Sequence, residues 1–137
     1  MEHLQLYVKN QSLDANVWYD VSELGQLQIT WDPRVRSHYT LIMYDIDAPY
    51  PNAPTNSPFV HILVTDIPGN EINRGVQKFP YTLPSPPANS PAHRYIIALY
   101  HRGRQTHSIQ EKDYQKMTQS SFPNRGAQMV INFLPYN

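Results

Sequence analysis

Two carboxylates and two histidines stand at the ends of apolar runs in this chain. Asp45 and Asp47 close one run. His61 opens a second run, and His93 opens a third, with the phenol of Tyr95 two residues further on. Imidazole nitrogens can donate to an anion, and a carboxylate can orient an imidazole or accept from an ammonium group. These residue types beside proline-rich loops predict a small polar pocket for a phosphate-like or amine-bearing headgroup.

The two aspartates have different expected roles. Asp45 and Asp47 are separated by one residue, so on a regular strand they face the same side and repel each other unless one has a cationic partner. Arg94 is the candidate partner, because a guanidinium group can bind a carboxylate through two parallel hydrogen bonds. We therefore expect Asp47 and Arg94 to serve the structure and Asp45 to face the pocket.

The same residues leave other chemistry open. Two histidines and one aspartate are suitable ligands for zinc or non-haem iron. A small hydrolase could use His61, His93 and Asp45 for acid–base or metal-assisted catalysis. Nucleophilic hydrolysis is disfavoured, because the sequence shows no cysteine and no glycine-flanked serine turn. We predict a protein with no catalytic residue, no metal and no cofactor.

Composition limits the class of protein further. The 137 residues suffice for one core, so we expect a single domain over residues 1–137. Lys+Arg and Asp+Glu both number 11, and this zero net charge gives no reason to expect nucleic-acid binding. The N-terminus lacks the pattern of a signal peptide, and no apolar run approaches the roughly 20 residues of a membrane span. We expect a soluble, cytoplasmic monomer with no integral membrane association.

The elements that position these residues are predicted to be mostly β-strands. Thirteen prolines against five glycines indicate short strands joined by stiff loops. Alternating apolar residues at 4–8 and 27–31 predict half-buried strands. Helix-forming residues over 110–119 predict one short helix near the C-terminus, followed by a last strand over 127–134. Denser apolar runs predict central strands that are buried on both faces, and these runs are 39–44, 60–65 and 95–100.

The motifs around the candidate pocket resemble those of the phosphatidylethanolamine-binding protein family, which includes Raf kinase inhibitor protein and the plant flowering-signal proteins. Residues 45–49, D-I-D-A-P, resemble the family signature D-P-D-A-P. Residues 86–87 and 93–95 reproduce the second signature, P-P-x5-H-R-Y, with its spacing. The resemblance runs from about residue 27 to the C-terminus. Further similar segments are 29–32, 63–68 and 103–106.

The resemblance implies a central antiparallel sheet packed on a smaller sheet, with an anion pocket near one edge. It also implies binding rather than catalysis, directed at lipid headgroups, at phosphorylated or kinase partners, or in some members at serine proteases. Protein surfaces would carry the last of these activities, so protease inhibition is an alternative to headgroup binding. Family members hold phosphate or a phosphoryl headgroup with residues that match Asp45, Ala48, Pro49, His61, Pro87, His93 and Tyr95.

The expected roles in this pocket follow from the resemblance and from the residue types. We expect His61 and His93 to donate to the anion and Asp45 to orient one imidazole or to meet an ammonium group. Pro49 and Pro87 are expected to shape the walls. Phe59 and Tyr95 are expected at the rim. The predicted function is that of a non-enzymatic regulatory protein that binds phosphoethanolamine-like headgroups or a phosphorylated signalling partner.

The chain departs from the family pattern near this pocket. Ile46 replaces the usual proline between the aspartates. Ser85 stands where many members have glycine, and its hydroxyl could donate to the ligand. Pro58 follows Ser57 in a stretch where members carry a cis peptide between non-proline residues, and proline lowers the cost of a cis bond from about 3 to about 1 kcal/mol. We therefore assign Pro58 a structural role. The resemblance does not extend to the family's final helix, so we expect an open site.

Overall fold

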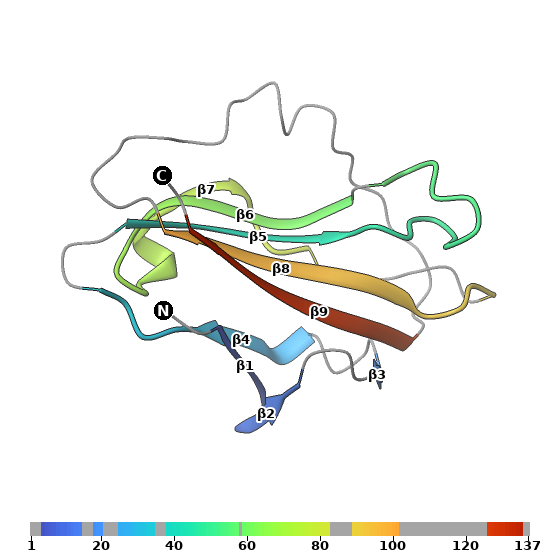
Figure 1. Ribbon diagram of the computed structural model, residues 1–137, viewed down its shortest axis with the longest axis horizontal. Helices are drawn as coiled ribbons and strands as arrows, with labels where there is room; N and C mark the ends of the chain where they lie inside the picture. Colours follow the sequence, from blue (N-terminus) through green and yellow to red (C-terminus); the bar gives the residue numbers. More distant parts are fainter. Residues whose placement is uncertain are drawn as a thin grey trace.

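Two β-sheets packed face to face form the fold (Figure 1). The computed structural model describes residues 4–14, 18–20, 25–34, 38–57, 59–82, 89–101 and 126–135. The small sheet has the order β2-β1-β4, and the large sheet has the order β3-β9-β8-β5-β6-β7. The predicted mostly β fold, with a larger sheet on a smaller one, is confirmed. The predicted helix at 110–119 lies outside the described residues.

The strands are short in the small sheet and long at the centre of the large one. The small sheet contains β1 (Gln5–Val8), β2 (Gln11–Leu13) and β4 (Leu27–Thr30). The large sheet contains β3 (Trp18–Asp20), β5 (His38–Asp45), β6 (Phe59–Pro68), β7 (Val76–Phe79), β8 (His93–His101) and β9 (Gly126–Pro135). A short 3-10 helix, η2 (Ile72–Arg74), precedes β7.

The three densest apolar runs form neighbouring central strands, as the sequence predicts. β5 pairs antiparallel with β6 on one side and with β8 on the other. The strand pairs in the described residues are antiparallel with one exception, because β9 runs parallel to β8. The short strands β2, β3 and β7 have no counterpart in the sequence predictions. Strands of three or four residues are too short to show a clear alternation.

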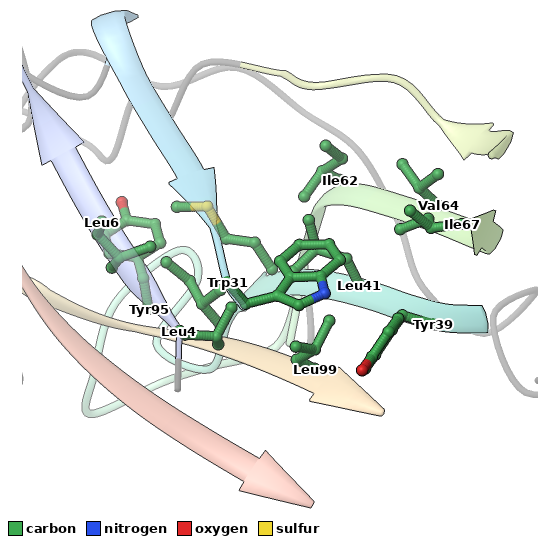
Figure 2. Close-up of a cluster of buried hydrophobic side chains, with 12 residues drawn as sticks. Leu4, Leu6, Trp31, Tyr39, Leu41, Ile62, Val64, Ile67, Tyr95 and Leu99 are labelled. Atoms are coloured by element: carbon green, nitrogen blue, oxygen red, sulfur yellow. The ribbon is translucent and has the colours of Figure 1, made fainter. Parts of the chain in front are cut away.

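The main core lies between the two sheets (Figure 2). Leu4, Leu6 and Trp31 pack from the side of the small sheet against the central strands of the large sheet. Full burial of an aliphatic or aromatic side chain of this kind contributes about 1.5–3 kcal/mol. The indole Nε1–H of Trp31 donates to the carbonyl of Gly69 at 3.1 Å, so the largest core side chain also leaves no unpaired donor. A second cluster covers the opposite face of the large sheet, with Ile42, Val60, Leu63 and Ala98 at its centre.

Two glycines allow the turns around η2. Gly69 adopts a φ of +60°, a left-handed conformation that glycine accepts readily. Gly75 lies so close to β6 that a β-carbon there would be 2.6 Å from Cγ1 of Val64 and 2.8 Å from the carbonyl oxygen of Thr65. The absence of a side chain at Gly75 therefore lets the chain return along β6 as β7. Within the described ranges, no helix has the length and apolar character required to cross a membrane.

Candidate anion-binding site

The candidate site forms where the end of β5 meets the beginnings of β6 and β8. Asp45 is the last residue of β5, and its partners across the sheet are Phe59 on β6 and Tyr95 on β8. The antiparallel pairing brings these residues into one row, because the end of one strand then lies beside the starts of its neighbours. His93 stands two residues before Tyr95 on β8 and therefore faces the same side of the sheet.

A β-bulge brings His61 to the same site. Val60 pairs with Tyr44 and Ile62 pairs with Met43, so His61 is an extra residue on β6 with no partner on β5. The bulge lets Ile62 join the core between the sheets while His61 stays on the side of Phe59. The His61 ring lies 4.8 Å from the Phe59 ring and 5.5 Å from the Tyr95 ring, measured between centroids.

Asp45 and His93 form a buried pair beneath this site. Nδ1 of His93 lies 2.6 Å from Oδ2 of Asp45, and the two side chains are almost completely closed off from solvent. The other carboxylate oxygen of Asp45 accepts a 2.7 Å hydrogen bond from the backbone N–H of Asp47. Both oxygens of Asp45 are thus engaged, and the carboxylate orients the His93 ring from below.

Ser90 engages the second nitrogen of His93. Its Oγ lies 2.8 Å from Nε2 of His93 and 2.7 Å from the carbonyl oxygen of Pro91. The hydroxyl has one proton. If it donates that proton to Pro91, then Nε2 must be the donor to Ser90. If it donates to Nε2, the Pro91 carbonyl loses this donor.

The order Ser90–His93–Asp45 is that of the catalytic triad of nucleophilic hydrolases. Ser90 lies three residues before His93 in the sequence, and the fold brings its Oγ within 2.8 Å of the ring, a contact that the sequence analysis did not anticipate. Its Oγ contacts both Nε2 of His93 and the Pro91 carbonyl. The geometry therefore assigns Ser90 to holding the ring and not to attack.

Asp47 and Arg94 form a separate ion pair at the start of β8. Oδ2 of Asp47 accepts from the backbone N–H of Arg94 at 2.7 Å and from its Nε–H at 3.0 Å, and Oδ1 accepts from an Nη2–H at 2.9 Å. Burial alone would raise the pKa of the Asp47 carboxyl, but the hydrogen bonds and charge of Arg94 hold this pKa below its usual value. The pair connects the segment that follows β5 to the start of β8.

The backbone of Thr82 holds the His61 ring, and burial favours the uncharged imidazole. Its Nδ1–H donates to the carbonyl of Thr82 at 2.7 Å, and the backbone N–H of Thr82 donates back to the carbonyl of His61 at 2.7 Å. Burial lowers the pKa of the His61 imidazole, although the Thr82 carbonyl and Asp45 act in the opposite direction. Nε2 makes no hydrogen bond with the described residues, so it remains available as an acceptor.

The hydroxyl of Tyr95 is the buried polar group without a partner in the described part of the chain. Its ring stacks beside His93 at 6.3 Å and lies edge-on to His61 at 5.5 Å, measured between centroids. Burial first, and then the negative field of Asp45, raises the pKa of this phenol, so the group stays protonated and can donate. An unpaired buried hydroxyl costs about 1–3 kcal/mol, which a ligand oxygen could recover.

The structure describes some of the other residues that were predicted for the site. Ala48 is buried, and the bond from Ala48 to Pro49 is cis. The Ala48 carbonyl accepts from the N–H of Asn56 at 2.9 Å, which closes the loop between β5 and β6. Phe59 and Tyr95 are both buried against His61 and do not stand at an exposed rim. Ser85, Pro87 and Pro58 lie outside the described residues.

Sequence reasoning missed two contributors to this site. Ser90 and Thr82 fix the rings of His93 and His61, one through a side chain and the other through its backbone. The three-residue spacing from Ser90 to His93 was a usable signal for the first. Nothing in the sequence marks Thr82, because a backbone carbonyl can come from any residue type. The described residues hold no cluster of three or more potential metal ligands.

Comparison with known proteins places this arrangement in a family. A family model described as phosphatidylethanolamine-binding protein matches residues 10–132. The chain belongs to the phosphatidylethanolamine-binding protein family. The match includes both signature segments and every strand from β2 to β8, which confirms the resemblance inferred from the motifs. Family membership agrees with the coarse expectation of a non-enzymatic binding protein.

Individual relatives come from plants and from an animal. The chain is 45% identical over 73 residues to Protein BROTHER of FT and TFL 1 of Arabidopsis thaliana, covering 52% of this chain and 40% of the relative. It is 39% identical over 113 residues to CEN-like protein 1 of Nicotiana tabacum, covering 71% and 64%. It is 34% identical over 76 residues to the 26 kDa secreted antigen of Toxocara canis, covering 56% and 29%. The chain thus spans 29% to 64% of the length of these relatives.

Proposed function

We propose that this protein is a non-enzymatic binding protein that holds a phosphate-like headgroup where β5, β6 and β8 meet. The observation that supports this proposal is the buried hydroxyl of Tyr95, which has no partner among the described residues and belongs to a ring 5.5 Å from the ring of His61. A phenol that stays protonated donates to a phosphoryl oxygen. A neutral imidazole nitrogen accepts from a protonated phosphate or from the ammonium group of phosphoethanolamine.

The buried groups around these two contacts act as supports. Asp45 orients His93, and Ser90 occupies the other nitrogen of that ring, so His93 would reach a ligand only after Ser90 released it. We therefore assign the direct contacts to His61 and Tyr95. Phe59 packs against His61, and Ala48, Pro49, Ser85 and Pro87 remain sequence-based candidates for the wall.

The same chemistry could come from two sources. A phosphatidylethanolamine-type lipid and a phosphorylated partner protein, such as a signalling protein in a kinase pathway, would both present a phosphoryl group to His61 and Tyr95. The lipid headgroup adds an ammonium group, and the neutral His61 nitrogen can accept a hydrogen bond from it. Phosphoethanolamine is therefore expected to bind more tightly than inorganic phosphate or a phosphoserine peptide.

Nuclear magnetic resonance titration tests the pocket. Inorganic phosphate, phosphoethanolamine and a capped phosphoserine peptide are added to ¹⁵N-labelled protein. We expect saturable shifts at residues 59–62 and 93–97. Tyr95→Phe keeps the ring and removes the donor, so it should weaken binding about tenfold or more, as expected for one hydrogen bond to a charged group. Tyr100→Phe is the matched control, because Tyr100 lies on the same strand but on its opposite face.

Three results would overturn this proposal. One is the absence of shifts at millimolar ligand. Another is equal binding by Tyr95→Phe and the parent protein. The third concerns the enzymatic alternative, since stoichiometric zinc or iron in the purified protein would favour a metal-assisted hydrolase over a simple binding module.

A further inference from the structure

The small sheet ends in an open edge at β4. Among the described strands, β4 pairs with β1 on one side, with Gln5 opposite Thr30 and Val8 opposite Leu27, and it has no strand on the other side. An edge strand of this kind presents unpaired backbone N–H and C=O groups to any chain that lies beside it.

A groove runs along this open edge. It has a volume of about 530 Å³ and is lined by Gln28 and Ile29 of β4 and by the turn from Asn70 to Arg74, which contains η2. Neighbouring side chains on a strand point to opposite faces. A groove that touches both Gln28 and Ile29 must therefore pass the edge of the strand, and β1 already occupies the other edge.

An apolar pit adjoins the groove. It measures about 130 Å³ and shares Ile29 and Ile72 with the groove. Its remaining lining residues are Leu27, Ile62 and Tyr81. Ile62 belongs to the main core, so the pit lies where the small sheet meets the core face of β6. Tyr81, at 37% exposure, is one of two large apolar side chains exposed in the described residues.

We propose that this edge is a docking site for an extended peptide of a partner protein. The peptide lies beside β4 as a fourth strand of the small sheet and places one aliphatic side chain in the pit. Backbone groups of β4 would supply the hydrogen bonds, and the pit would select the side chain, as in other cases of strand addition to a sheet edge.

The lining of the groove defines the peptide. Its two charged residues, Glu71 and Arg74, are bound to each other at 2.8 Å, so the groove has no net charge and suits an uncharged segment. The side chain of Asn70 donates to the carbonyl of Trp31 at 3.0 Å and so closes the groove just after the end of β4. β4 has four residues, about 13 Å of strand, which corresponds to a segment of four to six residues.

Binding of designed peptides tests this proposal on the whole chain. The probe is a fluorescent, capped hexapeptide pool with serine, threonine and glutamine at the variable positions and leucine fixed at position three. We expect saturable binding, with shifts in ¹⁵N-labelled protein confined to residues 27–30, 70–74 and 81. Alanine at position three should weaken binding about tenfold, because the pit then loses its side chain. N-methylation of alternate backbone nitrogens should abolish binding.

Variants of the protein complete the test. Ile72→Asp places a charge at the pit and should lower peptide affinity at least tenfold. Val76→Asp is the matched control, because Val76 is an exposed aliphatic residue outside the groove and the pit. If Ile72→Asp unfolds the protein, Gln28→Pro serves as the second variant, since it disturbs the edge without touching the pit.

Several outcomes would overturn the proposal. One is the absence of binding at about 1 mM peptide, a concentration at which even a weak specific complex would form. Another is binding that N-methylation leaves unchanged, which would indicate a simple apolar pocket. Self-association that protects residues 27–30 would show that a second copy of this chain occupies the edge instead of a partner peptide.

Discussion

The Asp45 carboxylate lies 2.6 Å from Nδ1 of His93, and solvent reaches neither group to a meaningful extent. The pair joins the end of β5 to the start of β8 directly beneath the candidate site. A buried charged group of this kind depends on its partner, because removal of one member leaves the other without compensation in a medium of low dielectric constant. The pair therefore stabilises the contact between β5 and β8 and also supports the candidate site.

Asp45→Asn should destabilise the protein by about 2–3 kcal/mol. Asn offers one carbonyl oxygen, whereas Asp45 accepts from both His93 and the backbone of Asp47, so one buried donor would lose its acceptor. Urea unfolding measures the change. Glu71→Gln is the control, because it breaks an exposed ion pair with Arg74 and should change the free energy of unfolding by less than about 1 kcal/mol. Equal effects of the two variants would contradict the importance of the buried pair.

Ser90→Ala should remove the hydrogen bond at Nε2 of His93 but should leave headgroup binding intact. The variant removes the hydroxyl next to Nε2 and leaves the Pro91 carbonyl without that donor, at a cost of about 1–2 kcal/mol. Imidazole ¹⁵N shifts should report the loss of the hydrogen bond at Nε2. If phosphoethanolamine affinity were lost completely in a folded Ser90→Ala protein, then Ser90 or His93 would have to contact the ligand directly.

Stability should fall as the pH drops through the ordinary range of histidine, in part because of His61. Burial lowers the pKa of His61 in the folded protein, whereas in the unfolded chain it is about 6.5. Below about pH 6.5 the unfolded state therefore binds more protons than the folded state, and the free energy of unfolding decreases. The fall continues until the pH reaches the lowered folded pKa. In His61→Gln, the difference in unfolding free energy between pH 7.5 and 5.5 should be smaller than in the parent protein.

Arg94→Ala should raise the pKa of the Asp47 carboxyl. Burial then acts with less opposition, because two of the three hydrogen bonds to Asp47 come from the Arg94 side chain. The contribution of Asp47 to stability is present above its unfolded pKa of about 3.9 and is lost as the pH falls through its folded value. Arg94→Ala should move this loss to higher pH. A ¹³C titration of the carboxyl gives the pKa directly, and Arg74→Ala should leave it unchanged.

Gly75→Ala should be more destabilising than Gly69→Ala. A β-carbon at Gly75 would meet Val64 and the Thr65 carbonyl at 2.6–2.8 Å, and overpacking of this kind costs about 1–3 kcal/mol. A β-carbon at Gly69 would meet only Pro33, at 3.7 Å, so its cost comes from the left-handed backbone and amounts to about 1–2 kcal/mol. Thermal unfolding of both variants compares the two causes. A stable Gly75→Ala protein would mean that β7 can move away from β6.

The central strands could be predicted from the sequence because the signal is local. A dense apolar run indicates a strand buried on both faces, and such runs cover most of β5, β6 and β8. The motifs at the ends of these strands were also local and sufficed to suggest the family. The pairing of Asp47 with Arg94 followed from charge alone. Ser85, Pro87, Pro58 and the helix over 110–119 remain predictions.

Only the tertiary structure decided which atoms of these residues are engaged. The sequence shows that His61 and His93 are histidines, but the bulge that turns His61 to the site depends on the register of β6 against β5. Ser90 and Asp45 occupy both nitrogens of His93, while the Tyr95 hydroxyl is left unpaired. A hydrogen bond is set by ångström distances between groups far apart in the chain. Residue type and spacing therefore determine which chemistry is possible, and packing determines which nitrogen or hydroxyl is available for it.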